Sequence, residues 1–82
     1  MKNLMKRISA NPNICHGKPC IKGHRIMVYQ ILNLLEMGLS FDEIIHKHFP
    51  QITQEDIQAC IHYANSIIQN EEIHYYEGSQ KN

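Results

Sequence analysis

The residues whose types and spacing most clearly suggest a chemical role are three closely spaced cations: Lys18, Lys22 and Arg25. They lie in a stretch punctuated by Gly17, Pro19 and Gly23. Glycine permits positive φ angles and proline fixes its own φ, so this stretch predicts a stiff, shaped turn that presents positive charge. Its partner would be an anion, either a nucleic-acid phosphate or an acidic protein surface. The alternative is that the glycines only form turns and the cations only solvate them.

Two cysteines and two histidines in the same region are potential zinc ligands: Cys15, His16, Cys20 and His24. Their spacing fits no standard zinc pattern, because Cys15 and His16 are adjacent and cannot easily share a tetrahedral site. We therefore expect neither a metal nor another cofactor. Catalysis is not expected either, since the sequence has no phosphate loop or dinucleotide fingerprint and Cys60 falls on an apolar helical stripe.

The net charge of zero conceals an uneven distribution along the chain. Residues 1–35 carry six cations and no acid, whereas residues 36–82 carry two cations and eight acids. Such asymmetry suggests contact with nucleic acid or a charged protein. Attraction between the two halves, within one protomer or across a dimer, explains it equally well.

The length of 82 residues predicts one small domain with a limited core, and association of two copies would bury more surface. The number of cysteines is odd, and neither a signal-peptide pattern nor a run of about 20 apolar residues occurs. We therefore expect a homodimer that is cytoplasmic and has no membrane contact.

Apolar spacing predicts a mostly α fold with a short β element near the N-terminus. Short strands are expected near residues 7–9 and 25–27. A first helix begins at Val28 and ends at Gly38, a favourable residue after a helix. Ser40 heads a second helix through a capping box with Glu43. The expected apolar face of this second helix is formed by Phe41, Ile44, Ile45, His48 and Phe49.

The third helix, residues 54–69, is headed by Thr53 and has an apolar face rich in isoleucine. We expect Ile67, Ile68 and Ile73 to extend beyond the core and form a dimer contact. The four-residue break before this helix matches helix-turn-helix spacing, so the core is expected to be a three-helix, homeodomain-like helix-turn-helix. Residues 1–73 would form this single domain, and residues 74–82 a disordered tail.

The outer face of the third helix carries amide side chains suited to base recognition. Gln54 and Gln58 could pair with adenine edges in a major groove. Residues 54–69 contain no Lys or Arg, however, and Glu55 and Asp56 would repel a phosphate backbone. Strong binding to DNA by this helix alone is therefore not expected.

The stretch described first also follows a known signature, G-x-P-x-[IV]-x-G-T-R-[IV]-x-V. The matching residues are Gly17, Pro19, Ile21, Gly23, Arg25, Ile26 and Val28. On this basis the chain resembles, over about residues 7–64, the small prokaryotic domain-of-unknown-function family four-three-three, whose members are often regarded as VapB-like helix-turn-helix antitoxins. His24 replaces the usual Thr of the signature.

The resemblance implies an antitoxin that neutralises a PIN-like ribonuclease toxin and binds operator DNA. The expected binding residues are Lys18, Lys22, Arg25, Gln54 and Gln58. Two alternatives stay open: a stand-alone DNA-binding transcriptional regulator, and a non-catalytic dimerisation module.

Overall fold

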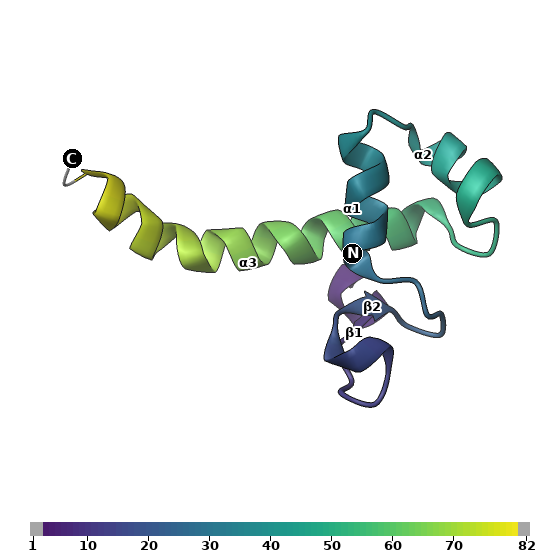
Figure 1. The fold of residues 1–82 in the computed structure, drawn as a ribbon, viewed down its shortest axis with the longest axis horizontal. Helices are drawn as coiled ribbons and strands as arrows, with labels where there is room; N and C mark the ends of the chain where they lie inside the picture. Colours follow the sequence, from purple (N-terminus) through teal and green to yellow (C-terminus); the bar gives the residue numbers. More distant parts are fainter. Residues whose placement is uncertain (1–2, 81–82) are drawn as a thin grey trace.

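The computed structural model describes the backbone of residues 3–80 and the side chains of residues 3–70. The fold is mostly helical, with a two-stranded sheet near the N-terminus. Helix α1 (Val28–Glu36) crosses α3 (Gln54–Gln80), while α2 (Phe41–Glu43) and η3 (Ile44–His48) lie beside the N-terminal end of α3 (Figure 1). The expected fold class is confirmed at this level.

The N-terminal segment contains four short elements. Two are 3-10 turns, η1 (Leu4–Arg7) and η2 (Cys15–Gly17), and two are strands, β1 (Ile8–Ser9) and β2 (Cys20–Ile21). The strands pair antiparallel, with Ile8 opposite Ile21. The expected strand near residues 7–9 is confirmed, but the one near 25–27 is wrong: there Met27 makes only an isolated bridge to Cys20. The second strand is β2, which lies before the glycine turn and not after it.

The helix boundaries follow from local side-chain chemistry. Gly38 ends α1 at φ +95°, and the Leu39 N–H donates to the Leu34 carbonyl at 3.2 Å, which completes a Schellman-type end. The Glu43 N–H donates to Ser40 Oγ at 3.1 Å, and the Ser40 N–H donates to Glu43 Oε1 at 2.9 Å. The capping box expected at this position is therefore confirmed.

The second helical segment is not a regular α-helix. After α2 it widens into the π-helical turn η3, and the Phe49 N–H donates to the Ile44 carbonyl at 2.9 Å. The wider turn changes the direction in which successive side chains point. Ile44 is fully buried, whereas His48 is exposed, so the expected place of His48 on the apolar face is wrong.

The core lies where α1, η3 and the start of α3 meet the sheet. Its buried members are Ile21, Ile26, Val28, Ile31, Ile44, Ile52, Ile57 and Cys60. η1 and β1 both pack against α3, so α3 is covered on more than one side. Ala59, which lies off the apolar stripe, is buried as well.

Two expectations concern residues outside the described side chains. The predicted dimer contact of Ile73 lies there, and so do the side chains of the predicted tail, residues 74–82. The backbone of α3 continues to Gln80, past residue 69, where the sequence pattern ends the third helix. None of the described helices is both long and apolar enough to cross a membrane.

Candidate nucleic-acid and partner interface

The turn between β2 and α1 is built around Gly23. Gly23 adopts φ +85°, as the sequence predicts, and its turn is closed by the His24 N–H, which donates to the Ile21 carbonyl at 3.0 Å. The Ile21 N–H in turn donates to the Ile26 carbonyl at 2.8 Å. These bonds fix the backbone on both sides of the turn and hold Lys22 and Arg25 at the surface.

A cavity of about 420 Å³ lies beside this turn. It is lined by Ser9, Asn11, Ile14, Cys20, Lys22, Gly23, His24 and Arg25. Two of the three predicted binding cations therefore share one cavity, and no carboxylate lines it. A hollow with two cations and several neutral hydrogen-bonding groups is suited to an anionic ligand such as a phosphate.

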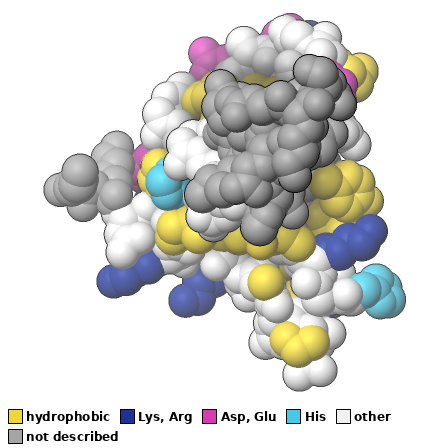
Figure 2. All heavy atoms as spheres, turned by 90° about the vertical axis from the view of Figure 1, so that its left-hand side faces the viewer, with side chains coloured by type: hydrophobic (Ala, Val, Ile, Leu, Met, Phe, Trp, Pro, Cys, Tyr) yellow, Lys and Arg dark blue, Asp and Glu magenta, His cyan; other side chains and the backbone are white. Residues whose placement is uncertain are grey.

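The third cation, Lys18, lies apart from that cavity. Its Nζ is 5.2 Å from the centre of the Tyr29 ring on α1, close enough for a cation–π contact. Seen along α3, the Lys and Arg side chains lie mostly below the helix, on the N-terminal segment, and acidic side chains lie at the top (Figure 2). The structure thus brings together Lys22 and Arg25 but not Lys18.

Arg7, which the sequence does not single out, joins the N-terminal segment to the start of α3. Its Nη1 is 3.0 Å from Asp56 Oδ1, and its Nη2 is 2.7 Å from Glu55 Oε1. Asp56 is 7% exposed, and its other oxygen accepts the Thr53 N–H at 3.0 Å. Here the two oppositely charged halves of the chain attract each other within one protomer.

This contact changes the electrostatics expected for α3. Glu55 and Asp56 were expected to repel a phosphate backbone, but Arg7 neutralises one of their two charges. The only sequence signal for this contact is the uneven charge of the two halves, which identifies no particular pair.

The two predicted amide residues lie on the surface of α3 and differ in their surroundings. Gln54 Nε2 donates to Asp42 Oδ1 of α2 at 3.3 Å, so this side chain is held against the neighbouring element. Gln58, one turn later, is exposed, and its side chain makes no hydrogen bond to any residue whose side chain the structure describes. Of the two, Gln58 is therefore better placed to contact a ligand.

Beyond its packed first turns, α3 projects away from the rest of the chain (Figure 1). The apolar residues on this part are unusually open to solvent: Ile61 is 40% exposed, Ile67 39% and Ile68 59%. The three lie within two turns of the helix and form what we call the isoleucine stripe. An exposed apolar surface on a projecting helix is suited to a protein partner.

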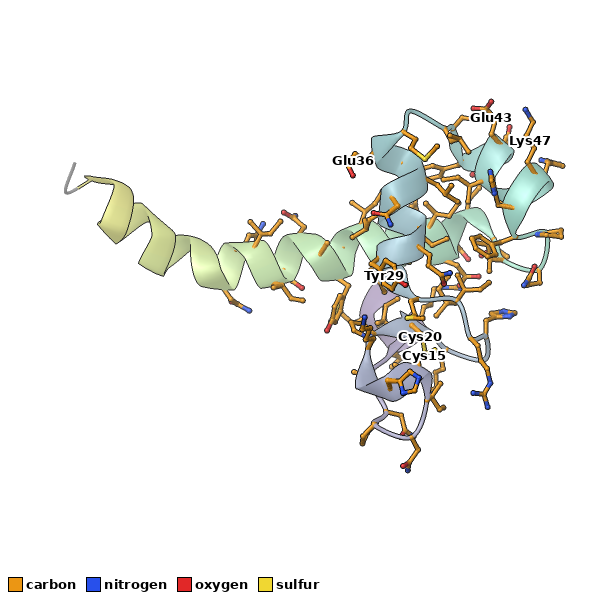
Figure 3. All side chains as sticks on the ribbon, in the orientation of Figure 1. Cys15, Cys20, Tyr29, Glu36, Glu43 and Lys47 are labelled. Atoms are coloured by element: carbon orange, nitrogen blue, oxygen red, sulfur yellow. The ribbon has the colours of Figure 1, made fainter. Side chains whose placement is uncertain are left out.

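Outside the turn, burial and local hydrogen bonds shift the pKa values of two ionisable side chains, Cys60 and Glu43. Burial, together with the charge of Asp56, raises the pKa of the Cys60 thiol to about 12, which keeps it protonated. Hydrogen bonds from Ser40 lower the pKa of Glu43, and Lys47 adds to the effect (both labelled in Figure 3). No three His, Cys, Asp or Glu side chains within residues 3–70 gather as potential metal ligands.

The profile described as Protein of unknown function (DUF433) matches residues 8–64, which is more than half of the chain. The chain belongs to the DUF433 family. The matched range takes in the sheet, the Gly23 turn, the cavity and the packed part of α3, but not the last isoleucines of the stripe. Comparison with curated proteins and with solved structures finds no match.

Proposed function

We propose that this DUF433 protein is a non-catalytic, antitoxin-like protein of the cytoplasm that binds and neutralises a PIN-like ribonuclease toxin. The observation that carries the proposal is the isoleucine stripe on the projecting part of α3. An amphipathic helix that places its apolar side chains into a groove is a recurrent way of binding a protein partner. A toxin with such a groove would cover the isoleucines that the chain leaves open.

The test uses the product of the neighbouring open reading frame as the candidate toxin. Ile68→Asp should weaken the complex about tenfold or more, because an apolar side chain of this size contributes roughly 1.5–3 kcal/mol when buried. Gln69→Glu is the matched control, since it adds the same charge at an exposed polar position that lies about 100° around the same helix from Ile68. Equal affinities of the two variants, or no complex at all with the wild-type chain, would contradict the proposal.

A second copy of the chain is the alternative occupant of the stripe. Sedimentation of the isolated chain at tens of micromolar tests it, as an order-of-magnitude choice of concentration. A dimer that Ile68→Asp dissociates, combined with no binding to the neighbouring product, would favour a non-catalytic dimerisation module. A wild-type monomer would leave the stripe to another protein.

Binding to operator DNA is the second proposed function, and a homeodomain-like helix-turn-helix is the proposed form of the core. Two observations favour it: Arg7 offsets the acidic start of α3, and Gln58 is exposed on the same helix. Lys22 and Arg25 would then supply phosphate contacts, and Lys18 would lie on a separate flank. Gln54, which is bonded to Asp42, would lie close to the major groove of the DNA.

A mobility-shift titration distinguishes the roles of these residues. Lys22→Gln should weaken binding uniformly across sequences and lower the salt slope by about one unit. Gln58→Ala should instead cost roughly 1–3 kcal/mol at one base pair only. Tight, sequence-specific binding by the isolated chain would favour a stand-alone regulator over an antitoxin.

A further inference from the structure

The loop before β2 contains Cys15 and has an unusual backbone conformation. Three consecutive residues, Cys15, His16 and Gly17, have φ angles of +52°, +57° and +81°. Two of them carry side chains, for which this region is sterically costly, and such conformations persist only where the surroundings impose them. The Gly17 N–H donates to the Ile14 carbonyl at 2.9 Å, and the Lys18 N–H donates to the Cys15 carbonyl at 3.0 Å.

This left-handed turn reverses the chain, so Cys15 comes to lie beside Cys20 on β2 (Figure 3). Cys20 is itself held firmly, because it pairs with Ser9 of β1 and the next carbonyl upstream, that of Pro19, accepts the Val28 N–H at 2.9 Å. The Cys15 side chain is close enough to the Cys20 thiol to perturb its pKa. Both cysteines are free thiols.

The two thiols differ in their access to solvent. Cys15 is half-buried, so a small reagent can reach it, whereas Cys20 is 1% exposed. Burial is the main cause that raises the pKa of Cys20; the neighbouring Cys15 adds to the effect, and Arg25 opposes it. Cys15 is therefore the thiol that an oxidant meets first, and Cys20 is the thiol positioned to react with the product.

We propose that Cys15 and Cys20 form a peroxide-sensitive dithiol, which closes to an intramolecular disulfide and thereby fixes the left-handed turn to the sheet. Hydrogen peroxide first oxidises the Cys15 thiolate to a sulfenic acid and releases hydroxide. The Cys20 sulfur, losing its proton, then attacks the Cys15 sulfur; the S–O bond breaks and the oxygen leaves as water. In total two thiols lose two electrons and two protons, and one peroxide becomes two waters.

The chain contains an internal control for this reaction. Cys60 is the third of the three cysteines and is fully buried on α3. Its raised pKa, about 12, keeps its reactive thiolate form scarce. In the folded protein it should therefore react with peroxide at least about tenfold more slowly than Cys15.

The experiment treats the intact folded chain with graded hydrogen peroxide and then counts thiols after denaturation. The wild-type chain should fall from three titratable thiols to one, become lighter by two hydrogens, and recover all three thiols with a dithiol reductant. Peptide mapping should find Cys15 joined to Cys20. Cys60→Ala should react in the same way, whereas Cys15→Ser, which changes a half-exposed position, should keep its fold by circular dichroism and form no internal disulfide.

Several outcomes would overturn the proposal. One is that all three thiols survive peroxide concentrations that oxidise a free thiol of similar exposure. Others are the conversion of Cys15 to the sulfinic acid without a disulfide, and disulfides that join two chains. A Cys15–Cys60 or Cys20–Cys60 bond would also overturn it.

Discussion

Replacing Arg7 tests whether its contact with α3 holds the N-terminal segment in place. Arg7→Met keeps most of the aliphatic stem but removes the guanidinium from both carboxylates. The side chain of Asp56 is only 10% exposed, so its bond to Arg7 is the stronger of the two. Hydrogen bonds to charged groups contribute about 1.5–3 kcal/mol. In the bond to Glu55, the Arg7 side chain is 38% exposed and the Glu55 side chain 32% exposed. Water therefore screens this ion pair, and it adds less than about 1 kcal/mol.

The expected loss is therefore about 2 kcal/mol in the free energy of unfolding, measured by urea denaturation. In a domain of this size it corresponds to a fall in Tm of very roughly 8–16 °C. Lys6→Met is the matched control, because Lys6 is exposed, lies next to Arg7 and has no ion-pair partner among residues 3–70; it should change stability by less than about 0.5 kcal/mol.

A double-mutant cycle with Asp56→Asn isolates the Arg7–Asp56 pair from other effects of each change. We expect a coupling free energy of at least about 1 kcal/mol, which persists in high salt because Asp56 is shielded from solvent. If Arg7→Met proves no more costly than Lys6→Met, or the coupling is zero, the N-terminal segment is held by apolar packing alone.

Three further predictions concern single positions. Gly23→Val should destabilise the chain by at least about 1–2 kcal/mol in urea melts because of the positive φ, while Gly23→Asn should cost less; since no atom lies within 4 Å of a Cβ built there, equal costs would show that the backbone conformation is not the cause. Glu43 has a lowered pKa, so its contribution to stability is present at pH values above its ordinary pKa of 4.5 and is lost as the pH falls through its folded-state pKa. Glu43→Gln should therefore make the free energy of unfolding depend less on pH in this acidic range, and an unchanged slope would contradict the stabilising role of the Glu43 carboxylate. Ile31→Ala, at a side chain with no exposed surface, should cost about 2–5 kcal/mol in the same melts, and a loss below about 1 kcal/mol would mean that the core collapses around the gap.

The features that the sequence predicts well are those decided by a few neighbouring residues. Gly23 and Gly38 take positive φ angles because the local turn requires them, and Ser40 with Glu43 caps a helix because both partners lie within one turn. The start of α3 follows the same rule, since Asp56 accepts the Thr53 N–H.

The features that the sequence does not predict depend on distant or irregular contacts. β2 is only two residues long and both are buried, so it has no alternating pattern to read. The π-helical turn η3 shifts His48 to the surface, and an α-helical period cannot anticipate that shift. The partners of Arg7 are also hidden, because many acidic residues follow it and only the folded chain selects Glu55 and Asp56.

The contact of Arg7 with Asp56 affects how the chain folds during its synthesis on the ribosome. The two residues are 49 positions apart, so the N-terminal segment emerges long before its partner is synthesised. Until then η1 and β1 have no α3 to pack against. Closing so long a loop early would cost conformational entropy that no contact with α3 offsets. The domain therefore cannot complete its fold until the start of α3 has been synthesised, and a ribosome stalled before residue 56 carries a chain in which this contact cannot form.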